Sequence, residues 1–153
     1  MDLRATLQAA TKDAMKAKDS ARLSTLRLIG AAIKDREIAA RGGDGDGALG
    51  DHDLIAILSK MVKQRQESAR AYEEGGRLEL AEREQAEIGV IQEFLPRQLS
   101  PAEIEAAIDA AIADLGATGV RDMGRVMGAL RERHAGQMDF GAAGALVKAR
   151  LMG

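Results

Sequence analysis

The stretch SPAEIEAAIDAAIADLG at residues 100–116 marks the clearest structural boundary in the chain. Ser100 and Glu103 have the spacing of a capping box, in which each side chain accepts a hydrogen bond from the backbone N–H of the other residue. Pro101 stands at the first helical position, where the helix requires no N–H from it. Isoleucine then recurs every four residues until Gly116, as on one face of a helix. The stretch therefore predicts a helix that begins at residue 101 and a domain boundary just before it.

Helical spacing of apolar residues recurs on both sides of this boundary. The apolar stripes cover residues 3–14, 23–38, 54–72 and 81–95 before it, and 123–130 and 140–151 after it. Capping residues stand at several expected helix starts, namely Asp19 or Ser20, Asp51, Asp122 and Asp139. No run alternates between apolar and polar residues as a half-buried strand would. The sequence therefore predicts an all-α fold.

Residues 41–50 hold five glycines and two aspartates, which predicts a loop between two helices. Within it, residues 45–50 match the pattern G-x-G-x-x-G. A dinucleotide site needs that pattern directly after a strand, and here helices are expected on both sides, so we expect no nucleotide to bind. Taken together, the stripes and breaks predict an N-terminal helical bundle over residues 1–98 and a small C-terminal three-helix subdomain over residues 99–153.

The composition, 46% hydrophobic and 30% charged, is typical of a globular protein. Tyr72, Phe94 and Phe140 are the whole aromatic set, so the core must be built from aliphatic side chains. There is no cysteine, the first residues lack the apolar run of a signal peptide, and no stretch reaches the ~20 apolar residues of a membrane span. We therefore expect a cytoplasmic protein without a membrane partner.

The net charge of −2 conceals two basic zones. Residues 12–36 hold seven bases and three acids, and residues 121–153 hold six bases and three acids. Local charge, rather than the total, decides which partner a surface attracts. Both zones are therefore candidates for contact with an anionic partner.

Residues that could perform chemistry are sparse and scattered. His52 and His134 are far apart in the sequence, and no carboxylates accompany them at metal-ligand spacing. The serines have no histidine close by that could act as a base. We therefore predict no catalytic residues, no metal site and no cofactor.

Lys60 and Lys63 belong to a basic and polar run on the third expected helix. Lys60 and Gln64 are four residues apart, so they share a face of that helix opposite its apolar stripe. This face could bind an anionic partner. It could equally be an ordinary solvated helix surface.

Gly124 and Gly128 stand four residues apart inside the sixth expected helix, where each glycine costs about 1 kcal/mol relative to alanine. Close approach of the backbone to a neighbouring helix, or to a ligand, would account for that cost. Four basic residues accompany the glycines: Arg125, Arg131, Arg133 and Lys148. Small residues beside bases suit contact with a phosphodiester backbone, and Arg125 is expected to lie exposed and to contribute little to folding.

Four segments resemble the signature blocks of the GatB/YqeY family, in family order. They are RLSTLRLIGAAIK at 22–34, KMVKQR at 60–65, GVIQEFLP at 89–96 and DMGRVMG at 122–128. The resemblance implies a two-part helical fold like the tail domain of the B subunit of the amidotransferase that converts Glu-tRNA to Gln-tRNA, a tail that helps to bind tRNA. The family is also associated with carbon–nitrogen ligase activity that uses glutamine as amide donor. The domains of that enzyme that perform this chemistry have no counterpart in the sequence.

These observations predict an RNA-interacting module, with tRNA as the expected ligand and a tRNA synthetase or amidotransferase as a further partner. The expected contacts are phosphate contacts from the basic residues named above, because three aromatics provide no stacking platform. The alternative is a protein-interaction adaptor that docks a partner helix and binds no nucleic acid. An independent enzyme is the third possibility, disfavoured by the missing catalytic set.

Overall fold

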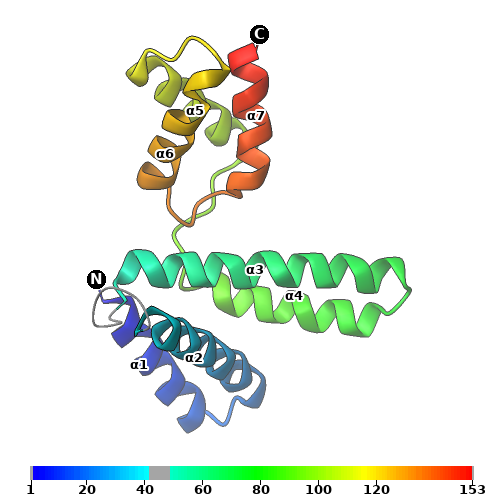
Figure 1. Cartoon of the computed structure of the whole chain (residues 1–153). Helices are drawn as coiled ribbons and strands as arrows, with labels where there is room; N and C mark the ends of the chain where they lie inside the picture. Colours follow the sequence, from blue (N-terminus) through cyan, green and yellow to red (C-terminus); the bar gives the residue numbers. More distant parts are fainter. Residues whose placement is uncertain (1, 42–48, 153) are drawn as a thin grey trace. The chain divides into compact units, whose positions relative to one another are not determined.

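The computed structural model of the chain describes residues 2–41 and 49–152. Within these residues there are helices and no strand, so the predicted all-α class is confirmed (Figure 1). The helices are α1 (Leu3–Lys16), α2 (Ser20–Arg41), α3 (Asp51–Glu74), α4 (Leu78–Gln92), α5 (Pro101–Leu115), the short 3-10 helix η1 (Val120–Asp122), α6 (Met123–Arg133) and α7 (Phe140–Met152). Most of the loop predicted at 41–50 lies outside the described residues.

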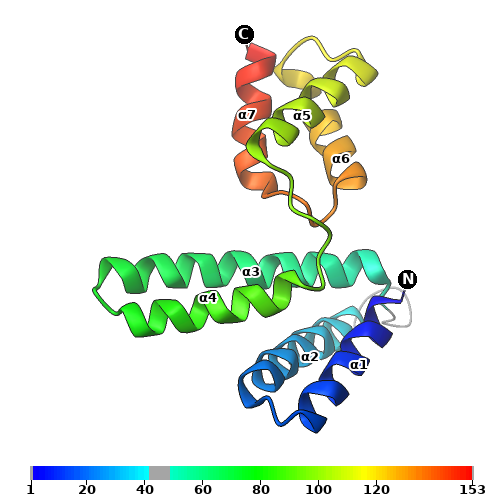
Figure 2. The same cartoon turned by 180° about the vertical axis from the view of Figure 1, so that it is seen from behind.

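The contacts divide the chain into two compact units, on either side of the Leu95–Pro96 bond. In the first unit, α3 and α4 form an antiparallel hairpin, and α1 and α2 form a second antiparallel pair that packs against it (Figures 1 and 2). Gly75 ends α3, and Gly76 adopts a left-handed φ of 75°, which lets the chain reverse into α4. These two glycines separate the apolar stripes predicted at residues 54–72 and 81–95.

An aliphatic core holds these four helices together. Ile29 of α2, Leu54 and Leu58 of α3 and Ile91 of α4 are each no more than 1% exposed. An ion pair also joins α3 to α4, in which Arg65 Nε donates to Glu87 Oε2 at 2.9 Å. Its side chains are only 15% and 23% exposed, so it is better shielded from solvent than the other ion pairs of this unit.

The N-terminal caps confirm one prediction and correct another. Asp19 caps α2 by accepting a hydrogen bond from the Arg22 amide at 3.1 Å. Asp51 does not cap α3, because Gly50 takes the extended cap conformation and Asp53 accepts the Gly50 amide hydrogen bond at 3.1 Å. Asp51 instead lies inside α3, and its carboxylate accepts a hydrogen bond from the Leu3 amide at the start of α1. The aspartate therefore ties two helices together.

The second unit packs α5, α6 and α7 around its own aliphatic core. Ile108 of α5, Val126 and Leu130 of α6 and Val147 of α7 are each no more than 1% exposed. The carboxylate of Asp122 accepts hydrogen bonds from the Thr118 and Gly119 amides, rather than from the first turn of α6. It therefore closes the turn that leads into α6.

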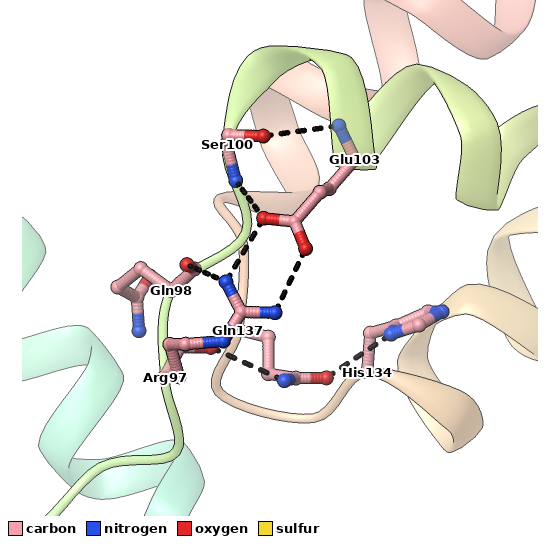
Figure 3. Close-up of polar contacts among 6 residues, drawn as sticks. All are labelled: Arg97, Gln98, Ser100, Glu103, His134 and Gln137. Carbon is pink, nitrogen blue, oxygen red and sulfur yellow. Dashed lines mark hydrogen bonds and ion pairs between the residues drawn. The ribbon is translucent and has the colours of Figure 1, made fainter.

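The predicted capping box at the start of α5 is confirmed (Figure 3). Ser100 Oγ accepts a hydrogen bond from the Glu103 amide at 3.2 Å, and Glu103 Oε1 accepts one from the Ser100 amide at 3.0 Å. Both terminal nitrogens of the Arg97 guanidinium donate hydrogen bonds to the same carboxylate, at 2.9 and 2.8 Å. The Gln137 amide group in turn donates to the Arg97 carbonyl at 3.1 Å. The segment before α5 is thereby bound to the turn between α6 and α7.

The glycines of α6 correct another expectation. Gly124 and Gly128 were expected to allow close approach of either a neighbouring helix or a ligand. The first alternative is wrong, because a Cβ added at either position would meet no atom within 4 Å. The reason is their place on the helix: Val126, Met127 and Leu130 face the core, and the two glycines are exposed on another side. Packing within this unit therefore does not require them.

Because of this open space, Gly124→Ala and Gly128→Ala should each raise the free energy of unfolding by about 0.5–1 kcal/mol, through the better helix propensity of alanine. Urea denaturation followed by circular dichroism measures the change. Gly116→Ala provides the contrast, because Gly116 ends α5 at a φ of +62° and an alanine there should destabilise the fold. A loss of stability at Gly124 or Gly128 would contradict the open space around them.

The hydrogen bonds from Arg97 and from the Ser100 amide lower the pKa of Glu103 to about 2, from an ordinary value of about 4.5. A carboxylate whose pKa is lowered by folding stabilises the protein above its unfolded pKa, and that contribution is lost as pH falls through the folded pKa. Glu103→Gln should therefore lower the melting temperature at pH 7, and the deficit should shrink between pH 4.5 and about 2.

Thermal unfolding followed by circular dichroism over a pH series measures this difference. Glu132→Gln is the matched control, because Glu132 is exposed and has no ion-pair partner among the described residues. The melting temperature of Glu132→Gln should stay close to that of the wild type at every pH of the series. A Glu103→Gln deficit that is unchanged down to pH 2 would contradict the assigned role of the carboxylate.

Candidate nucleic-acid interface

Lys60 of α3 lies in a hollow of about 380 Å³ that α2 and α3 form together. The lining residues are Ala32, Asp35, Arg36, Ala39, Ile57, Lys60, Met61 and Gln64. Lys60 and Gln64 were expected to share a face, and both line this hollow. Lys63 is exposed but is not part of the lining.

Arg36 is the residue of this hollow that sequence analysis did not single out. It comes from α2, 24 positions before Lys60, and no motif connects the two helices. The sequence feature that could have pointed to Arg36 was its place in the basic zone at residues 12–36. Neither Arg36 nor Lys60 forms an ion pair within the described part of the chain. The hollow therefore presents two cations and one amide, with Asp35 as the one carboxylate in its lining.

Arg125, the candidate between the two glycines, is held by its own unit. Its guanidinium donates to Asp122 Oδ1 at 3.1 Å and to the Leu115 carbonyl at 2.9 Å. The second bond satisfies a backbone acceptor at the last turn of α5, where a helix has no internal donor to offer. The Arg125 side chain is 58% exposed, as expected, but it joins the end of α5 to the start of α6.

Arg133 is engaged in a similar way, because its guanidinium donates to Asp114 of α5 at 2.9 Å. Arg131 has no carboxylate partner among the described residues, and its guanidinium lies 5.8 Å from the centre of the Phe140 ring. Lys148 is exposed on α7 and forms no ion pair within residues 2–41 and 49–152. The predicted basic cluster is therefore split into two arginines bound to α5 and two cations without a carboxylate.

Other classes of site are not supported by the described residues. No group of three or more histidine or carboxylate side chains is placed to hold a metal ion within residues 2–41 and 49–152. None of the helices in the described ranges combines the length and the apolar character that crossing a membrane requires. The hollow in the first unit and the C-terminal cations in the second unit are therefore two separate candidate contact surfaces.

Comparison with known proteins confirms the family resemblance. The YqeY-like protein family matches residues 4–151. A protein of Lachancea thermotolerans named altered inheritance of mitochondria protein 41, mitochondrial, is 38% identical over 115 residues, which cover 75% of this chain and 58% of the relative. The protein of the same name from Eremothecium gossypii is 36% identical over 119 residues, which cover 76% of this chain and 63% of the relative.

The chain thus spans less than two thirds of the length of these relatives, and their names place them, rather than this chain, in mitochondria. The family match, in contrast, runs through both helical units. This all-α chain belongs to the YqeY-like protein family.

Proposed function

We propose that the chain is an RNA-interacting helical module, with tRNA as its ligand, and that the hollow between α2 and α3 is its main phosphate contact. The observation that carries this proposal is the pair Arg36 and Lys60, which come from different helices, line one hollow and have no carboxylate partner within residues 2–41 and 49–152. The resemblance of the sequence to the amidotransferase tail supports the choice of RNA as the ligand.

The chemistry of the hollow suits a phosphate oxygen. Arg36 and Lys60 supply positive charge, and the Gln64 amide can donate a hydrogen bond to an uncharged or anionic oxygen. Asp35 opposes an anion, but the two cations outnumber it. None of the lining residues is aromatic, so contact with the backbone is favoured over stacking of bases.

The C-terminal unit offers a second, separate set of phosphate contacts through Lys148 and Arg131. Neither cation has to leave a carboxylate in order to meet a phosphate. The exposed face of Gly124 and Gly128 allows a backbone to approach α6 closely. Arg125 and Arg133 contribute less, because each would have to give up a bond to α5.

Replacing both cations of the hollow, as Arg36→Ala with Lys60→Ala, should weaken the binding of total tRNA and lower its salt dependence. Each lost phosphate contact should reduce the slope of log K against log salt by about one. Filter binding between low and moderate salt measures both quantities. The matched control is Arg70→Ala with Arg83→Ala, which removes two exposed cations from the same unit outside the hollow.

Equal losses in the two double variants would show that only net charge matters and would contradict the assigned hollow. Retention of tRNA by the wild type no better than by an unrelated acidic protein would remove the RNA function altogether. In that case, protein partners recovered after nuclease treatment would favour the adaptor function.

Arg125→Ala should act on stability more than on RNA. The variant loses the bond to the Leu115 carbonyl and the pair with Asp122, which should cost about 0.5–1 kcal/mol of unfolding free energy for a side chain this exposed. Lys148→Ala should show the opposite pattern, with stability changed by less than about 0.5 kcal/mol and a lower salt slope. Urea denaturation and filter binding on both variants measure the contrast. A large affinity loss in Arg125→Ala without a loss of stability would reverse this assignment.

A further inference from the structure

A groove of about 390 Å³ lies between α1 and α2, which run side by side in both views (Figures 1 and 2). Four aliphatic side chains of the core line it: Leu7, Leu26, Ile29 and Ile33. Ile38 also lines it and is 54% exposed, an unusually large exposure for an isoleucine. The volume is in the range of sites that enclose a small molecule or the anchoring side chains of a partner.

The charged residues around this groove are predominantly basic. Arg4, Lys34 and Arg41 line it, with Glu37 as the one acid. Glu37 is already occupied, because its carboxylate accepts from Arg4 at 2.8 Å. Lys34 and Arg41 have no carboxylate partner in the described part of the chain. Counted over the described residues, the lining therefore has a net positive charge, and Lys34 and Arg41 are the two cations in it that could meet an anionic partner.

The cations follow α2 in register. Arg27, Lys34 and Arg41 recur every seven residues, which is close to two turns of helix and places them on one side of α2. The residues of α2 that line the α2–α3 hollow, including Arg36, are different ones. Lys34 and Arg41 of this row line the groove, whereas Arg27 is not part of its lining and Arg36 belongs to the proposed RNA contact.

Gly30 helps to keep the groove open. It lines the groove in the interior of α2, where glycine is less stable than alanine. A Cβ added there would meet no atom within 4 Å, so packing within the unit does not require glycine. The missing side chain leaves space for a partner above the aliphatic floor.

We propose that this groove binds the apolar face of an acidic amphipathic helix from a partner protein. An aliphatic floor between two helices suits the side chains that such a helix presents at three- and four-residue spacing. Acidic residues beside that face would meet Lys34 and Arg41, which gives orientation and a faster encounter. A nucleic acid fits less well, because it offers no aliphatic anchor and the lining offers no aromatic platform. This site is additional to the proposed RNA function.

The test uses a synthetic peptide of about 16 residues, with leucines at three- and four-residue spacing and glutamates on the other positions, labelled for fluorescence anisotropy. It should bind the wild-type protein, and the affinity should fall as salt is added. A peptide with lysine in place of each glutamate should bind at least about tenfold more weakly.

Two variants locate the site. Gly30→Leu fills the groove and should weaken binding by at least about tenfold, as expected when an anchoring pocket is lost. Gly89→Leu is its matched control, because Gly89 is an exposed helical glycine on α4 with equally open space, and it should leave affinity unchanged. Lys34→Glu should weaken binding by about threefold at low salt. Arg83→Glu makes the corresponding change on α4 and should have no effect.

Circular dichroism and melting temperatures confirm that each variant is folded. Equal binding of the acidic and basic peptides, or unchanged affinity in both Gly30→Leu and Lys34→Glu, would overturn the proposal. So would self-association in sedimentation equilibrium that Gly30→Leu abolishes, because the groove would then hold a second copy of the chain.

Discussion

Packing of α3 against α4 is the interaction on which the first unit depends. Leu54, Leu58 and Ile91 are almost completely removed from solvent, and α2 adds Ile29 and Ile33 to the same core. Burial of such side chains stabilises a fold by roughly 1.5–3 kcal/mol each, so this contact exceeds any exposed ion pair in the unit. With α3 and α4 joined in this way, α1 and α2 pack on the hairpin. The hollow results from the packing of α2 on α3, and the groove from the packing of α1 on α2.

The second unit depends on a hydrogen-bond network as well as on its core. The residues before α5 have no regular structure, yet their backbone is bound: the Leu99 amide donates to the Gln137 carbonyl at 2.9 Å, and the Gln98 side chain donates to the Gly136 carbonyl. Arg97 then anchors the capping box through Glu103. Helix start, preceding segment and the α6–α7 turn are therefore one hydrogen-bonded assembly, which explains how a short segment can lead into a well-defined helix.

Ion pairs divide the basic residues into two groups: those bound to a carboxylate of the fold and those that could bind a partner. Arg22, Arg65, Arg125 and Arg133 each have a carboxylate partner, and Arg22 reaches Glu93 across 71 positions of sequence. Arg36, Lys60, Lys34 and Lys148 have none in the described residues. A count of bases along the chain cannot distinguish these groups, because the sequence does not show which carboxylate of another helix lies beside each base. The cations available for binding are consequently fewer than the bases counted in the two basic zones.

The sequence by itself determined the helices and most of their ends. Local hydrogen bonds and periodicity suffice to predict these features, because each acts within a few residues. They are the apolar spacing, the Ser100–Glu103 box, the Asp19 cap and the glycines that end α3 and α5. The tertiary structure alone decided that Asp51 bonds to α1, that Gly124 and Gly128 face open space, that Arg125 joins two helices, and that Arg36 and Lys60 line the same hollow. Each of these depends on which side of one helix faces another, and that is settled by packing of residues that are distant in the chain.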